Sequence, residues 1–173
     1  AKEIKHAVKD LMKAIDRATA YAHKRGVTVI AAAGNEAVNT DAMKELTFAP
    51  AANLHVVAVS ATGPIGWALG ATDFDRPASY SNFGRSLVDI AGPGGDFVLP
   101  GEDLCVVNTR QGPIIQVCWV LDMVISTVRG TSNASYGWAA GTSMAAPAVA
   151  GVAALLLERH GPMPPAELQA RLL

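Results

Sequence analysis

The 173-residue sequence has no excess of charge of one sign, no long apolar run and only two cysteines. Its 14 basic and 15 acidic residues are not gathered into like-charged runs, which argues against nucleic acid or an anionic membrane as a partner. Glycine, proline or a charge interrupts every apolar stretch before the roughly 18 residues that a membrane-spanning helix requires. Half of the residues are hydrophobic and 17% are charged, a composition that predicts one compact globular domain with a sizeable core.

Helical and strand-like apolar patterns both occur along the chain. Residues 2–25 place apolar side chains at three- and four-residue spacing, which predicts an amphipathic helix ending at Gly26. Residues 142–159 predict a helix that is apolar nearly all round and therefore buried, and 166–173 predict a short last helix. Unbroken apolar runs predict strands buried on both faces, as in a parallel sheet, over residues 27–35, 54–62, 86–92 and 120–128. The mixture predicts an α/β fold: a mainly parallel sheet flanked by helices.

One segment departs from this pattern. Residues 94–120 are rich in Gly, Pro and Asp, which predicts a loop excursion between strands with a hairpin around Gly112-Pro113. Both cysteines, Cys105 and Cys118, lie within it. In a secreted protein they would pair, a closure that the chain-entropy model values at about 3 kcal/mol. The alternative is two unpaired, partly buried thiols, and neither cysteine has the spacing of a zinc site.

A hydroxyl-bearing turn precedes the long apolar helix. Gly141 allows a close backbone approach, Thr142 can cap the helix, and Ser143 falls in the first turn. Unpaired backbone N–H groups and the positive end of the helix dipole meet there. Ser143 could therefore attack a carbonyl carbon while its own N–H binds the oxyanion. The alternative is that Thr142 and Ser143 only cap the helix.

A polar side chain also follows the first predicted strand. "AAAGNE" (31–36) presents the Asn35 amide at the carboxyl end of that strand, the edge where open α/β sheets gather their sites. A side-chain amide N–H is a good oxyanion donor, and Gly34 would leave room for a substrate backbone. The alternative is an ordinary turn asparagine after a strand.

Together these segments resemble the subtilisin-like serine proteases. "VTVIAAAGNE" and "GTSMAAPAVAGVAALL" are similar to the family's oxyanion-asparagine and serine segments, and "FAPAANLHVVAVSAT" and "ASYSNFGRSLVDIAGPG" lie between them in the family's order. The resemblance covers nearly the whole chain apart from about residues 94–120. It implies that residues 1–173 are the C-terminal portion of one peptidase domain with a three-layer α/β/α fold, incomplete in this chain. Since both ends fall inside predicted helices, we also expect a longer gene product.

The resemblance also assigns roles to residues. It implies Ser143 as the nucleophile, with Asn35 and the Ser143 backbone N–H as the oxyanion hole. Six further residues are implied to lie against the substrate, the first four as a wall of the primary specificity pocket: Ala31, Ala32, Ala33, Gly34, Thr142 and Met144. Oxidation of Met144, next to the nucleophile, would crowd it. Ala148 stands where the family often has a non-catalytic histidine, so that departure affects packing only.

The base that a serine nucleophile needs is missing from the expected segments. The family order is Asp, His, Ser, and neither an Asp-Thr-Gly-like nor a His-Gly-Thr-like segment occurs in the sequence. His6 and His23 are expected on the polar side of the first helix, His55 at the start of a strand and His160 at the end of the long helix. We therefore expect the Asp and His on an absent N-terminal segment or a companion chain, and this chain alone to be inactive.

Further implications concern cofactors, partners and location. Family members often bind structural Ca²⁺, and the available carboxylates, none with the spacing of a calcium loop, are Asp73, Asp75, Asp89, Asp96, Glu102 and Asp103. Ordinary solvated carboxylates are the alternative, and no cofactor is required for the chemistry. The expected partners are polypeptide substrates, the segment carrying Asp and His, and an inhibitory propeptide. The expected location is secreted or extracellular.

The function predicted from the sequence is that of a serine endopeptidase acting through an acyl-enzyme. The Ala and Gly pocket wall favours medium or large apolar side chains in the substrate. One alternative is a non-catalytic family member that acts as a binding or regulatory module, although the intact "GTSMA" and "AAGN" argue against it. An unrelated α/β domain binding an anion at the 142–159 helix would need a Gly-rich G-x-G-x-x-G turn, which the sequence lacks.

Overall fold

The computed structural model describes residues 2–43, 45–129 and 134–173. Its helices are α1 (Lys2–Lys24), α2 (Thr142–His160) and α3 (Pro165–Leu172), with short 3₁₀ turns η1 (Trp67–Leu69) and η2 (Cys118–Asp122). Its strands are β1 (Val29–Ala32), β2 (Val56–Thr62), β3 (Ile90–Pro93), β4 (Leu104–Thr109), β5 (Gly112–Val117), β6 (Val124–Arg129) and β7 (Ala134–Ala139). None of the helices in these ranges is long and apolar enough to cross a membrane.

The central element is a parallel sheet in the order β1-β2-β3. Val29 pairs with Val56, and Val59 pairs with Ile90, so the three strands run in the same direction. Val57 and Val59 are fully buried, as expected of a strand covered on both faces. The strands end at Ala32, Thr62 and Pro93, which together mark what we call the carboxyl edge of the sheet.

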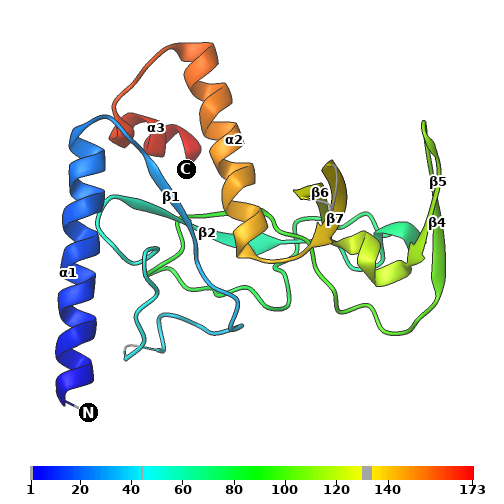
Figure 1. The fold of residues 1–173 in the computed structure, drawn as a ribbon, viewed down its shortest axis with the longest axis horizontal. Helices are drawn as coiled ribbons and strands as arrows, with labels where there is room; N and C mark the ends of the chain where they lie inside the picture. Colours follow the sequence, from blue (N-terminus) through cyan, green and yellow to red (C-terminus); the bar gives the residue numbers. More distant parts are fainter. Residues whose placement is uncertain (1, 44, 130–133) are drawn as a thin grey trace.

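Helices and loops cover both faces of this sheet (Figure 1). On one face Ala145 and Val149 of α2 pack against Val59 and Ala61 of β2, and Tyr80 completes this cluster. Gly92 lets α2 approach closely, because a Cβ atom there would lie 2.9 Å from the Ala145 carbonyl oxygen. The other face carries a second cluster of Ala31, Ala51, Val56 and Ala58. The predicted α/β fold with a parallel, helix-flanked sheet is confirmed.

The expectation that the long helix is buried is met on one side only within the described chain. Thr142, Ala145 and Ala153 are buried, but Val152 and Leu155 are 51% and 63% exposed. The helix is apolar on every side, yet the described chain covers only the side that faces the sheet. An apolar composition indicates which side chains can be buried. Which of them are buried depends on the neighbouring segments that pack against them.

The expectation of a fourth parallel strand over residues 120–128 is also wrong. Residues Cys118–Asp122 form η2, and β6 starts at Val124 and pairs antiparallel with β7. A short apolar run has the same pattern in a buried parallel strand as in a turn followed by a hairpin strand. Strand β7 is not predicted by any pattern in the sequence, and its six residues include Gly137.

The 94–120 excursion contains the predicted hairpin. Strands β4 and β5 pair antiparallel, with Thr109 opposite Gly112 at the turn. A disulfide joins Cys105 to Cys118, so the pairing predicted for a secreted protein is present. Figure 1 shows this hairpin projecting at the end of the molecule opposite α1.

Helix α1 is fastened to the turn that precedes β2. The Asp16 carboxylate accepts hydrogen bonds from Asn53 Nδ2 at 2.9 Å and from the Leu54 N–H at 3.0 Å. These bonds, that of Asn53 first, hold the pKa of Asp16 below its ordinary value. The rings of His23 and His55 stack with centroids 4.1 Å apart.

Candidate active site

Ser143 lies at the carboxyl edge, as the second residue of α2. The residue before the helix is Gly141, whose backbone is extended, and no side chain caps the helix start. Ser143 is exposed. The N–H of Met144 donates to the Gly141 carbonyl, whereas the Ser143 N–H has no acceptor within the described part of the chain. Both the hydroxyl and the amide of Ser143 are therefore available to a ligand.

Thr142 holds Asn35 next to Ser143. The Thr142 N–H and its hydroxyl both donate to Asn35 Oδ1, each at 2.9 Å, and the Thr142 hydroxyl accepts from the Gly34 N–H at 3.2 Å. A backbone N–H can only donate, so the atom that faces it is the amide oxygen and Asn35 Nδ2 points elsewhere. Thr142 is fully buried. The expectation that Thr142 caps α2 is therefore wrong, because its hydroxyl is used to orient Asn35. The expectation that Thr142 lies against substrate stays a prediction.

The two N–H donors border one small space beside Gly141. A Cβ atom at Gly141 would lie 3.6 Å from the Ser143 backbone nitrogen and 3.7 Å from Asn35 Nδ2. Asn35, like Ser143, is an exposed residue. Two N–H donors that converge beside a serine hydroxyl form the arrangement that stabilises a developing oxyanion.

A residue that the sequence did not single out fixes the loop around Asn35. Asn82 is fully buried, its Nδ2 donates to the Ala33 carbonyl at 3.0 Å, and its Oδ1 accepts from the Glu36 and Val38 N–H groups at 3.1 and 3.2 Å. Asn82 Nδ2 also donates to the Glu36 carboxylate. The loop is thus held on both sides of Asn35. No periodicity marks Asn82 in the sequence, and the neighbouring Ser81 gives the only local signal, a polar pair between apolar segments.

Asn82 also explains the glycine before Asn35. Gly34 has a φ of +106°, which L side chains rarely adopt, and a Cβ there would overlap Asn82 Nδ2. Asn82 and the Glu36 carboxylate fill the direction in which a side chain at Gly34 would point, and the expectation that Gly34 leaves room for a substrate backbone stays a prediction. Gly34 is therefore required because the Asn82 side chain, which holds this loop, leaves no room for a Cβ atom.

The other expected pocket residues differ in exposure. Ala31 and Ala33 are buried at 7% and 1% exposure, and Ala31 belongs to the core cluster with Val56. Ala32 and Met144 are half-buried. Of these four side chains, only those of Ala32 and Met144 are partly open to solvent in the described structure.

None of the four histidines lies beside Ser143. The His23–His55 stack precedes β1 and β2, at the opposite edge of the sheet from Ser143. His160 ends α2, about 25 Å from Ser143 at 1.5 Å per residue. His6 is exposed on α1, which Figure 1 shows well apart from the start of α2. The expectation that His23 is solvated is wrong, because it is half-buried against His55.

The carboxylates expected as calcium donors do not gather. Among the described residues there is no group of three or more His, Cys, Asp or Glu side chains placed to hold a metal ion. Asp96 is buried and accepts from the Ser79 N–H and hydroxyl at 2.8 and 2.7 Å, and Asp89 accepts from the Ala58 N–H at 2.8 Å. Asp89 and Asp96 are therefore engaged by donors of the protein itself, and the described carboxylates do not form a calcium site.

Tyr80 connects the core with the loop that follows β3. Its hydroxyl donates to the carbonyls of Gly94 and Gly95, at 3.0 and 2.7 Å. Burial, and then the Asp96 carboxylate, raise the pKa of Tyr80 to about 12. Gly94 in turn accepts from the Gly141 N–H at 3.0 Å, so this loop supports the serine turn.

Known proteins are similar in sequence to most of this chain. The model of the subtilase family matches residues 2–173. A thermophilic serine proteinase from Bacillus sp. strain AK1 is 35% identical over 143 residues, which are 82% of this chain and 24% of that protein. An extracellular serine proteinase from Thermus sp. strain Rt41A is 32% identical over 92% of this chain and 28% of its own length.

Solved structures give the same result. A lanthipeptide protease superposes with a TM-score of 0.67 at 31% identity, over 94% of this chain and 46% of that one. A protease from Pseudoalteromonas arctica gives 0.63 at 31% identity, over 90% and 37%. The chain thus spans about a quarter of the two curated relatives and less than half of the two solved chains.

Proposed function

The chain belongs to the subtilase family, and we propose that it supplies the nucleophile and the oxyanion hole of a serine endopeptidase. Residues 1–173 are, in this proposal, the C-terminal portion of one peptidase domain. The observation that carries it is the space beside Gly141, bordered by the Ser143 N–H and Asn35 Nδ2 and adjacent to an exposed serine hydroxyl. Helix capping alone would not account for an Asn35 amide held in place by two hydrogen bonds from Thr142.

In the proposed reaction, Ser143 Oγ attacks the carbonyl carbon of the scissile peptide bond. The carbonyl oxygen gains negative charge and accepts hydrogen bonds from the Ser143 N–H and Asn35 Nδ2. The proton of Ser143 passes to a histidine and from it to the leaving amine, which departs as an acyl-enzyme forms. Water then hydrolyses the acyl-enzyme by the same proton path. The removal of one oxyanion donor costs about 10²–10³ in kcat in this chemistry.

The histidine and its aspartate partner must come from outside residues 1–173, because the four histidines of this chain lie elsewhere. We propose that a segment N-terminal to this chain, or a companion chain of the same protease, supplies both. Within the described residues, one side of α2 is uncovered, with Val152 and Leu155 exposed, and the outer edge of β1 pairs with no other strand of the sheet. Both surfaces could be covered by such a segment.

The proposed substrates are polypeptides with medium or large apolar side chains before the scissile bond, and an inhibitory propeptide is a further proposed partner. Several relatives are described as extracellular proteases, from Xanthomonas campestris, Thermus sp. and Dichelobacter nodosus. Together with the Cys105–Cys118 disulfide, this supports a secreted or extracellular location.

Peptide hydrolysis by the protein that contains this chain together with the His- and Asp-bearing segment tests the proposal. Ser143→Ala is expected to abolish turnover, and Ser126→Ala, a matched change of an exposed serine on β6, is expected to retain it. Turnover that survives in Ser143→Ala would refute the assignment. Specific peptide binding without any turnover would instead identify a non-catalytic binding module.

A further inference from the structure

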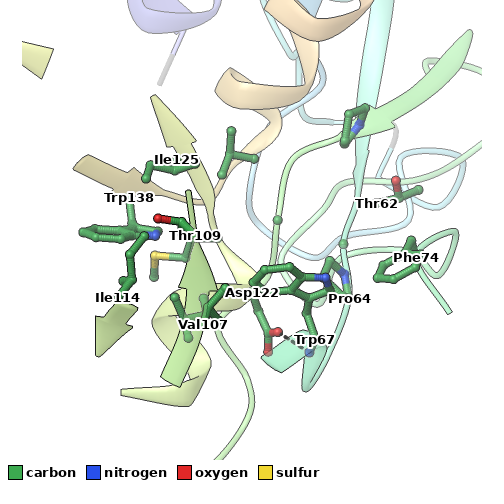
Figure 2. A pocket seen from close by; sticks show the side chains of 16 residues that line it. Thr62, Pro64, Trp67, Phe74, Val107, Thr109, Ile114, Asp122, Ile125 and Trp138 are labelled. Atoms are coloured by element: carbon green, nitrogen blue, oxygen red, sulfur yellow. Dashed lines mark hydrogen bonds between the residues drawn. The ribbon is translucent and has the colours of Figure 1, made fainter. Parts of the chain in front are cut away.

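An apolar pocket with a volume of about 560 Å³ lies between the two hairpins and η1 (Figure 2). We call it the hairpin pocket. Both hairpins contribute one face to it: Val107 and Ile114 come from β4 and β5, and Ile125 and Trp138 from β6 and β7. The disulfide fixes the base of the β4–β5 hairpin and so holds one wall in place.

The lining of this pocket is suited to an apolar side chain. Figure 2 shows Trp67, Phe74 and Trp138 around it. The carboxylate in the lining, Asp122, is 2% exposed, and its two oxygens accept from the N–H groups of Gly66 and Trp67, each at 2.7 Å. Because these hydrogen bonds engage both oxygens of the carboxylate, the pocket offers a ligand almost only carbon surface. A charged group would lose its hydration there without gaining a partner.

The hairpin pocket lies at the same edge of the sheet as the proposed active site. Thr62 and Pro93, the last residues of β2 and β3, line it, so it opens at the carboxyl edge where Ser143 also lies. The loop after β3 forms a shared wall: Gly95 lines the pocket, while the carbonyl of Gly94 accepts from the Gly141 N–H beside the serine. Neighbouring strands lie about 4.8 Å apart, so the ends of β2 and β3 are roughly 5–10 Å from the end of β1.

The pocket and the expected specificity wall lie on opposite sides of the nucleophile. In Figure 1 the start of α2 lies between β1, which leads to Asn35, and the two hairpins. The wall at 31–34 is expected to hold the side chain before the scissile bond, so a substrate that continues past Ser143 runs toward the hairpins. An extended peptide advances about 3.3 Å per residue, and two to four residues therefore cover the distance.

We propose that the hairpin pocket binds an apolar side chain of the polypeptide substrate on its leaving-group side, at the second to fourth residue after the scissile bond. This rests on the proposed peptidase function. The 94–120 excursion, which supplies one wall of the pocket, would then act as a specificity element. Substrates with Leu, Ile or Phe at one of these positions are preferred over those with Gly or Asp.

Two adjacent isoleucines provide a matched test. Ile114 lines the pocket, whereas Ile115 lies on the opposite face of the same strand and is 62% exposed. For the protein with its His- and Asp-bearing segment, kcat/KM is measured on peptides with Leu or Gly at each of the three positions. The Leu/Gly ratio is the kcat/KM of the Leu peptide divided by that of the Gly peptide. At the preferred position this ratio is expected to fall about tenfold in Ile114→Ser and to persist in Ile115→Ser. Ile125→Ser, at a 48% exposed lining position that tolerates a polar group, is expected to lower it as well.

The outcomes separate the two proposals. A wild-type protein that cleaves no peptide refutes the peptidase function. Cleavage with a Leu/Gly ratio near one, or with a ratio that Ile114→Ser and Ile125→Ser leave intact, overturns the pocket proposal only. If a fluorescent apolar probe binds the wild type and loses its binding in Ile114→Ser while the Leu/Gly ratio is unchanged, the pocket belongs to a small apolar ligand. That result would also overturn the pocket proposal.

Discussion

Replacing Asn82 with alanine tests whether its hydrogen bonds hold the loop that carries Asn35. The change removes the partners of the Ala33 carbonyl and of the Glu36 and Val38 N–H groups. A typical hydrogen bond contributes about 0.5–1.5 kcal/mol, and Glu36 is exposed enough for water to replace its bond in part. We therefore expect a loss of about 2–4 kcal/mol in the free energy of unfolding.

The same substitution should lower kcat through Asn35. With the loop free on both sides, Asn35 Nδ2 no longer keeps its place, and kcat should fall by up to about 10²-fold with little change in KM. Asn53→Ala is the matched control, because Asn53 is also a buried asparagine but its Nδ2 binds Met12 and Asp16 of α1. It should lose stability and keep kcat. The assay is peptide hydrolysis well below the melting temperature of each variant.

The conservative variant Asn82→Asp separates positioning from stability. Its carboxylate keeps both acceptor bonds, but it faces the Glu36 carboxylate and the Ala33 carbonyl, where Asn82 donates. Repulsion is relieved when the new carboxyl group is protonated, so activity relative to the wild type should recover as the pH is lowered. A fully folded Asn82→Ala protein with wild-type kcat would refute the reasoning.

Three further predictions follow from the geometry. Gly141→Ala places a methyl group between the two oxyanion donors without backbone strain, so kcat should fall at least about 10²-fold while thermal melting changes little. Because the pKa of Tyr80 is raised to about 12, the unfolded chain ionises first, and the stability that the neutral phenol contributes is fully present below about pH 10 and is lost between pH 10 and 12. Urea unfolding at several pH values should show this loss, and Tyr80→Phe should remove it. Reduction of the Cys105–Cys118 disulfide should lower the free energy of unfolding by up to about 3 kcal/mol, measured by denaturation with and without dithiothreitol, and an unchanged midpoint would contradict this.

Much of the fold could be predicted because its signals are local. The helix over 2–24 has a clear period and a glycine just beyond it, and β1 and the first four residues of β2 are unbroken apolar runs. The β4–β5 hairpin follows from a glycine-proline turn. The position of Asn35 next to Ser143 could also be expected, because both follow from strand ends and helix starts that meet at one edge of a parallel sheet.

The remainder depends on contacts between distant segments. The role of Thr142 requires Asn35, 107 residues earlier in the chain, and that of Asn82 requires the loop 46 residues before it. The hairpin pocket forms where η1, η2 and the two hairpins meet. The antiparallel pairing of β6 could not be distinguished from a buried parallel strand, because its partner β7 has no strong pattern of its own.

Fluorophosphonate labelling, read by denaturing intact-mass spectrometry, tests the central claim most directly. The sample is the protein that contains this chain together with the His- and Asp-bearing segment, and its Ser143→Ala variant is the control. The account predicts one phosphonyl group on Ser143 and none in the variant, with the mass spectrum also showing the segment that supplies the base. An unlabelled Ser143 in a folded sample that contains this segment, or a label that persists in Ser143→Ala, would contradict it.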